Sequence, residues 1–131
     1  MGENLHSVHF TVDEARGQLT EIHALASKMV ELKKSLTGSG WDVRKHAYFG
    51  GMGPNGDGSF PQEMETLVAI VRQLNQRGIM VKDLDIGLLD FPHVRASGEE
   101  VYLCWRLGED DVLFWHGTGE GFAGRRPIEE L

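Results

Sequence analysis

The second half of the chain, from Gly78 to Ile128, is a series of short apolar runs separated by turn residues. The runs are rich in β-branched, aromatic and aliphatic side chains, a composition typical of strands. We expect four strands, at about residues 79–83, 88–91, 100–106 and 112–116. Residues 84–87 and 107–110 read as tight turns, and Pro92 and Gly98 punctuate the link between the two hairpins. These runs predict a four-stranded antiparallel meander with a glycine-rich C-terminal tail, all within residues 79–128.

The third predicted strand is apolar on both faces. Val101, Leu103 and Trp105 point one way, while Tyr102 and Cys104 point the other, because side chains alternate along a strand. Helices can cover only one of these faces. The second face must therefore lie under the glycine-rich segments or against another subunit, and the latter arrangement predicts a homodimer.

Two helices precede the strands. Thr11 and Glu14 fit a capping box, and the apolar positions that follow predict an amphipathic helix over about residues 11–37. Ser59 as a cap and Pro61 in the first turn predict a second helix over about residues 59–77, with Gly78 as its C-terminal cap. The helices form either an antiparallel hairpin or half of a dimeric four-helix arrangement. Residues 6–10 suit an edge strand or an extended lead-in.

Residues 38–58 carry seven glycines and predict a long connection without regular structure. This loop is either a lid, with His46 at its centre, or an inert surface insertion. It lacks the Gly-Lys-Ser/Thr ending of a phosphate-binding loop. The whole pattern predicts an α+β fold in one domain, residues 1–131.

Composition excludes several function classes. The net charge of -7 argues against nucleic acid and against an anionic membrane as partners, because both are bound by clustered Lys and Arg. We find no apolar run of membrane-spanning length and no signal-peptide pattern. The single cysteine, Cys104, cannot form an internal disulfide and is typical of a reduced, cytoplasmic protein.

Three segments carry a family resemblance: VKDLDIGLLDF, VYLCWRLGE, and the closing FWH with GFAGRRPI. They resemble an uncharacterised family of short proteins, the domain-of-unknown-function family number 2203. The resemblance covers most of the chain, from the FTVDEA helix start to RRPI, and is densest from Val81 onward. It implies a small, mainly bacterial cytosolic protein. It implies no activity, cofactor or catalytic residue.

The first candidate site is a metal or acid–base site near the strand ends. Its candidate residues are Asp83, Asp85, Asp90, His93, Glu109 and His116. No pair among them has the spacing of a known metal-ligand motif, so the sequence predicts no metal and names no cofactor. Acids at these positions also cap turns for purely structural reasons.

The second candidate is a nucleophile, Cys104 activated by His116. If Arg106 lies opposite Asp111, the two side chains fall on opposite faces of the sheet. A register shifted by one residue places them on the same face. The alternative is that Cys104 is a small buried apolar residue, which we favour.

The third candidate is an anion site in the tail, where glycines precede Arg125 and Arg126. The competing interpretation is that these arginines pair with acids such as Asp90 or Glu109 and pin the tail to the sheet.

Our leading hypothesis is a dimeric binding or interaction module with its site on the sheet and the tail, taking a small anionic ligand. The candidate ligand-binding residues are Asp83, Asp90, His93, Glu109, His116, Arg125 and Arg126. The alternative is a small hydrolase-like enzyme built from Asp90, His93, His116 and Arg125, which requires these side chains to converge in one cleft. A third hypothesis is a regulatory partner that binds through the helix pair. The sequence does not decide whether the protein is an enzyme.

Overall fold

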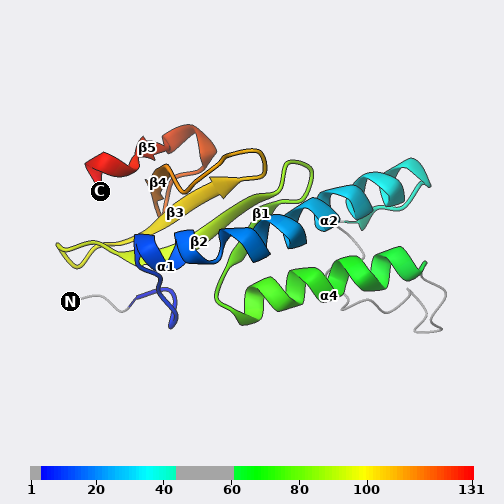
Figure 1. Ribbon diagram of the computed structural model, residues 1–131, viewed down its shortest axis with the longest axis horizontal. Coiled ribbons are helices and arrows are strands. Elements are labelled where there is room, and N and C mark those ends of the chain that lie inside the picture. The colour runs from blue at the N-terminus through cyan, green and yellow to red at the C-terminus, as the bar shows by residue number, and fades with distance from the viewer. Residues whose placement is uncertain (1–3, 44–60) are drawn as a thin grey trace.

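The computed structural model describes residues 4–43 and 61–131. The helices in these ranges are α1 (Val12–Gly17), α2 (Leu19–Gly38) and α4 (Gln62–Gln76), with 3-10 turns η1 (Phe122–Gly124) and η2 (Ile128–Glu130). The strands are β1 (Met80–Asp83), β2 (Leu88–Val94), β3 (Glu100–Arg106), β4 (Phe114–Gly117) and β5 (Arg126–Pro127). They form one antiparallel sheet in the order β1-β2-β3-β4-β5. The α+β class, with helices before the sheet, is confirmed (Figure 1).

The helical half corrects two of the predicted boundaries. The Thr11 capping box is present: the Glu14 amide donates to Thr11 Oγ1 at 3.0 Å, and the Thr11 amide donates to Glu14 Oε1 at 2.8 Å. The long predicted helix, however, is broken at Gln18, which follows the weak helix former Gly17 and separates α1 from α2. The helix predicted from about residue 59 begins at Gln62, and its predicted cap lies outside the described residues.

The two long helices form an antiparallel pair. In Figure 1, α2 and α4 lie side by side on one side of the sheet. Arg77 bonds Glu21 at one end of the pair, and Ser35 Oγ donates to Glu63 at 3.1 Å near the other end. The glycine-rich connection between them, including the lid hypothesis centred on His46, falls almost entirely outside the described residues.

The sheet has one strand more than predicted. Arg126 and Pro127, which we assigned to the tail, pair with Trp115 and Phe114 as β5. The indole of Trp115 explains this addition, because its Nε1 donates to the Pro127 carbonyl at 3.1 Å. Residues 6–10 form no strand in the sheet and match the extended lead-in: the Phe10 amide donates to the Pro92 carbonyl at 2.7 Å, beyond the part of β2 that pairs with β1.

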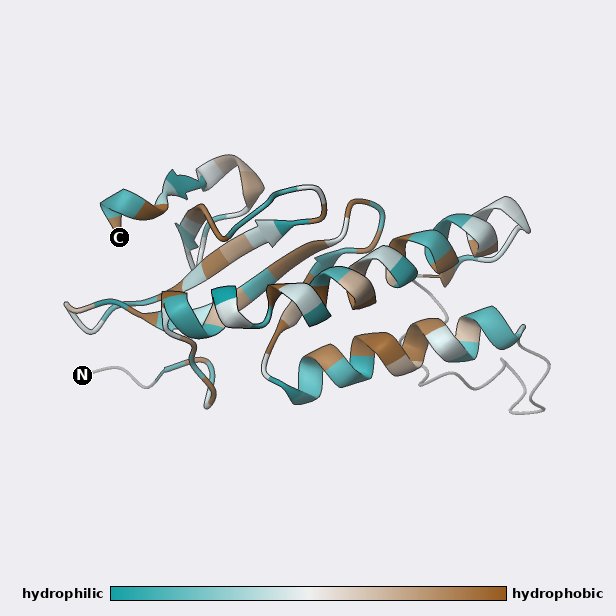
Figure 2. Ribbon diagram, in the orientation of Figure 1, coloured by the Kyte–Doolittle hydropathy of each residue, from teal (hydrophilic) through white to brown (hydrophobic). Residues whose placement is uncertain are grey.

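Alternation along the strands separates an inner face from an outer face. The inner face packs against the helices and supplies buried apolar side chains: Leu89, Phe91, Val101, Leu103, Trp105 and Trp115. Figure 2 shows hydrophobic residues along β2, β3 and α4. The outer face is also buried, at Leu88, Tyr102 and Cys104. Both faces of the central strands are therefore covered within one chain, so the apolar sheet does not by itself require a second subunit.

Candidate functional site on the outer face of the sheet

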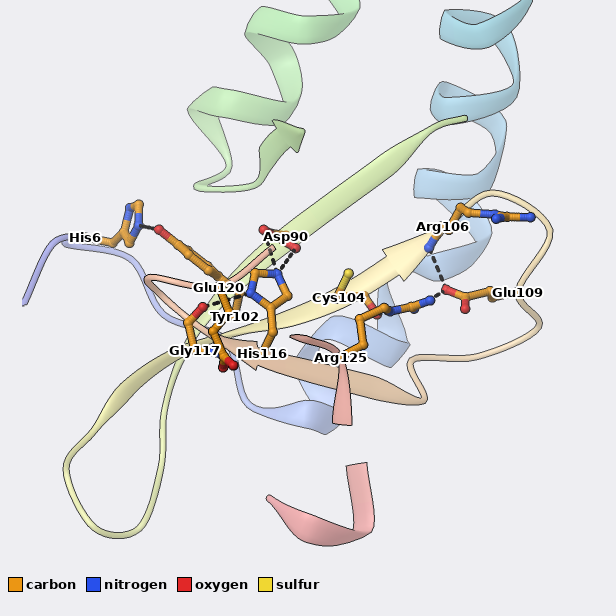
Figure 3. Close-up of polar contacts among 10 residues, drawn as sticks. All are labelled: His6, Asp90, Tyr102, Cys104, Arg106, Glu109, His116, Gly117, Glu120 and Arg125. Carbon is orange, nitrogen blue, oxygen red and sulfur yellow. Dashed lines mark hydrogen bonds and ion pairs between the residues drawn. The ribbon is translucent and has the colours of Figure 1, made fainter. Parts of the chain in front are cut away.

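Three polar side chains meet on the outer face, one from each of three adjacent strands. Asp90 on β2 lies directly opposite Cys104 on β3, and Tyr102 lies opposite His116 on β4. Because residues two apart share a face, this register places Asp90, Cys104 and His116 together. Their ligand atoms all lie within 4.8 Å of one another (Figure 3). We call these three residues the outer-face cluster.

The cluster is almost completely removed from solvent. Asp90 is 1% exposed, Cys104 0% and His116 3%. Charged side chains are rarely buried this deeply unless they are paired. Asp90 and His116 therefore occupy two positions where packing alone would favour apolar side chains, beside the buried Cys104.

Asp90 and His116 form the centre of the cluster. The Nε2 atom of His116 lies 3.1 Å from both carboxylate oxygens of Asp90, and its Nδ1 atom lies 2.8 Å from the Gly117 carbonyl oxygen. The Gly117 carbonyl can only accept, so Nδ1 donates to it, and Nε2 shares a proton with the Asp90 carboxyl group. Burial alone lowers the pKa of His116, but the bonds to Asp90 and to the Gly117 carbonyl outweigh burial and raise this pKa above its ordinary value.

Cys104 is placed beside the pair as a protonated thiol. Burial, followed by the charge of Asp90, raises the pKa of Cys104 to about 12. The Nε2 atom of His116 already contacts Asp90 and does not activate the sulfur. In this arrangement Cys104 is not a nucleophile, because the thiolate is the reactive form. This agrees with our favoured interpretation of a buried residue.

The pairing of β3 with β4 is shifted by one residue from the register that places Arg106 opposite Asp111, the first of our two alternatives. Cys104 lies opposite Phe114, so Cys104 and His116 share a face. The loop before β4 contacts α1: Arg16 donates to the Val112 carbonyl at 2.9 Å and lies 3.1 Å from Asp111, and β4 begins at Phe114.

Tyr102 extends the polar outer face toward the N-terminal segment. Its ring centroid lies 5.4 Å from that of His116, and its hydroxyl lies 2.7 Å from Nε2 of His6. Burial, with the charges of Asp90 and Glu100, raises the pKa of Tyr102. The neutral phenol of Tyr102 thus adjoins the cluster. The sequence patterns gave no reason to single out Tyr102.

The other predicted site residues have local structural roles. Asp83 Oδ1 accepts from the Asp85 amide at 2.8 Å and caps a turn. His93 lies on the inner face, where its Nδ1 donates to the Phe10 carbonyl at 2.7 Å. The residues proposed for a hydrolase are therefore divided between the two faces: Asp90 and His116 meet, and His93 does not join them.

The tail arginines pair with acids. Arg125 contacts Glu109 at 2.7 Å, and its guanidinium lies 4.1 Å from the centroid of the Phe114 ring. Glu109 also accepts from the Arg106 amide at 2.7 Å. Arg126 contacts Glu120 at 3.4 Å and lies 4.9 Å from the centroid of a Trp115 ring. These contacts match the interpretation in which the arginines pin the tail to the sheet.

Residues 9–128 match a family of proteins described as "Uncharacterized conserved protein (DUF2203)". The chain belongs to this family. The matched region of this DUF2203 protein contains every helix and strand named above from α1 to β5, and all of the outer-face cluster. Neither a curated protein nor a solved structure shows significant similarity to the chain. Within the described residues of this DUF2203 chain, no helix is both long and apolar enough to cross a membrane.

Proposed function

We propose that this DUF2203 protein is a small binding protein whose ligand site is the outer-face cluster. The observation that carries the proposal is the burial of the Asp90–His116 pair beside the Cys104 thiol, at three adjacent sheet positions. Removing such polar side chains from water is costly, and a buried pair of this kind often stabilises a fold no better than apolar residues of the same size. A ligand supplies the reason for this arrangement that packing does not.

Catalysis has less support in this geometry. The hydrolase hypothesis needs Asp90, His93 and His116 in one cleft, but His93 lies on the inner face. The nucleophile hypothesis needs a thiolate paired with His116, but Cys104 is protonated and His116 is occupied by Asp90. We therefore place the function in binding.

The remaining parts of the binding hypothesis are separate predictions. A small anionic ligand at Arg125 and Arg126 would have to displace Glu109 and Glu120, so we place the ligand at the cluster. A free thiol is best kept in a reducing compartment, which fits a cytoplasmic location. A homodimer is expected to give a scattering mass of twice 14.6 kDa, and a mass of one chain would exclude it.

Native mass spectrometry tests the proposed site. The protein, purified without chelators, is expected to carry a bound mass beyond 14.6 kDa that is absent from Cys104→Ser. His23→Gln is a matched control, because His23 is exposed on α2 and away from the cluster in sequence, and it should keep the bound mass. A bare wild-type chain, or a bound mass that survives in Cys104→Ser, would overturn the proposal.

A further inference from the structure

The ligand of the outer-face cluster has to be very small. The side chains that would touch it are 0% to 3% exposed, which leaves no open surface for a metabolite or a peptide. A single ion held by the three ligand atoms, which lie within 4.8 Å of one another, needs far less room than a metabolite. The question is then which ions the cluster would select.

The distances are close to those of a coordinated metal. With bonds of about 2.0–2.1 Å to nitrogen and oxygen and about 2.3 Å to sulfur, ligand atoms around a tetrahedral ion lie roughly 3.2–3.6 Å apart. The Nε2 atom of His116 is already 3.1 Å from the Asp90 oxygens, and the sulfur of Cys104 is within 4.8 Å. Closing the three atoms onto one ion therefore requires a movement of roughly 1 Å by the sulfur.

A second observation is independent of the three ligand atoms. The other ring nitrogen of His116, Nδ1, donates to the Gly117 carbonyl at 2.8 Å. Metal-binding histidines usually donate their second N–H to a carbonyl or a carboxylate, which fixes the orientation of the ring and the nitrogen that faces the metal. His116 is therefore already held with Nε2 aimed at the position an ion would occupy.

The donor atoms define the class of ion. One sulfur, one nitrogen and carboxylate oxygen suit borderline-soft divalent metals, whereas Ca²⁺ and Mg²⁺ select sites made of oxygen alone. Three protein ligands also leave the fourth tetrahedral position for water or another small group.

We propose that Asp90, Cys104 and His116 bind one divalent transition-metal ion of the zinc class. This inference rests on the proposed binding function and names its ligand. The ion binds the Asp90 carboxylate, the Cys104 thiolate and Nε2 of His116, and it releases to solvent the thiol proton and the proton shared by Nε2 and Asp90. The tail lies beside one ligand of the site, since Arg125 donates to the Cys104 carbonyl at 3.3 Å.

Cobalt(II) is the probe that tests the assignment. The full chain, stripped with a chelator and kept reduced, is titrated with Co²⁺ under anaerobic conditions. We expect one Co²⁺ per chain, visible absorption of a tetrahedral ion, a sulfur-to-cobalt charge-transfer band, and displacement by Zn²⁺ but not by Mg²⁺.

Variants of the ligands provide the comparison. Cys104→Ser should lose the charge-transfer band and bind at least about tenfold more weakly, since even residues behind the ligands change affinity by about 10–100-fold. His116→Gln should weaken binding by at least the same factor, and His23→Gln should bind like wild type. Circular dichroism shows which variants are folded. Since Cys104→Ser is close to isosteric, it keeps the test decisive if His116→Gln does not fold.

The outcomes separate this inference from the proposed function. Folded wild type without a cobalt spectrum, or ligand variants that bind as tightly as His23→Gln, would exclude the metal. If a non-metal mass is then found on wild type and lost in Cys104→Ser, the binding function stands and only its metal ligand is wrong. If no bound mass is found either, both are wrong.

Discussion

At the scale of single residues, the Asp90–His116 pair should be strongly coupled. Each side chain is buried against the other, so removing one leaves an uncompensated polar group. We expect Asp90→Val and His116→Leu each to lower the metal-free free energy of unfolding by about 3 kcal/mol, at the lower end for a buried pair because His116 can release its proton.

The double variant is the control for this coupling. Asp90→Val with His116→Leu leaves no unpaired charge and keeps the volume nearly constant, so its stability should lie within about 1 kcal/mol of wild type. Urea unfolding of the four proteins in a chelator measures the coupling free energy. Losses that simply add in the double variant would show that the two residues stabilise the fold independently. Near-equal stability of the double variant would show that packing alone does not require the pair.

At the scale of elements, the turn from α4 into β1 depends on one glycine. Gly78 has a φ of +91°, as expected for the predicted helix cap, and its amide donates to the Asn75 carbonyl at 2.9 Å. A Cβ atom added there would lie 2.8 Å from Val8. Gly78→Ala should therefore cost about 1–3 kcal/mol of unfolding free energy, measured by urea denaturation.

Gly17→Ala is the matched comparison for this turn. Gly17 ends α1, and a Cβ atom there meets no heavy atom within 4 Å. The substitution should be neutral or should stabilise by up to about 1 kcal/mol, because it reduces the freedom of the unfolded chain. If both glycine variants lose the same unfolding free energy, the positive φ of Gly78 is not the cause of the loss.

The N-terminal segment should respond to acid through Glu100. Burial tends to raise the pKa of this carboxyl, but His9 and the amides of Leu5 and His6 outweigh burial and lower the pKa below its ordinary value of 4.5. A lowered pKa means that the carboxylate stabilises the fold above pH 4.5 and that this contribution is lost as pH falls through the folded-state pKa.

We therefore expect the amide NMR signals of Leu5 and His6 to shift toward unfolded values as pH falls below 4.5. Glu100→Gln should show the released signals at neutral pH. Glu99→Gln, which removes the neighbouring acid paired with Arg95 and not with the segment, should titrate like wild type. A segment that stays attached in Glu100→Gln would assign the attachment to other contacts, such as that between His6 and Tyr102.

At the scale of the whole molecule, the sequence predicted those features that depend on near neighbours along the chain. The Thr11–Glu14 cap, the alternation along β3 and the α+β class all follow from local patterns, and all are present. The break at Gln18 and the added strand β5 were missed. The latter depends on an indole bond between Trp115 and Pro127, which strand propensity does not contain.

The sequence named the three members of the outer-face cluster as candidates but left open whether they meet. Asp90 and His116 were both candidates, but their meeting with Cys104 requires the one of two registers that places Cys104 and His116 on the same face. Both registers were consistent with the sequence between β3 and β4. The cluster joins β2, β3 and β4. An ion bound there should therefore stabilise the sheet as a whole.

Zinc should therefore raise the melting temperature of the protein. An ion that binds only the folded chain, at a thousand times its dissociation constant, adds about 4 kcal/mol of stability, which for a chain of this size is about 10–15 °C. Differential scanning calorimetry should show this rise for wild type and His23→Gln, little change for Cys104→Ser, and full reversal on adding a chelator. An equal rise in Cys104→Ser would assign the effect to surface sites.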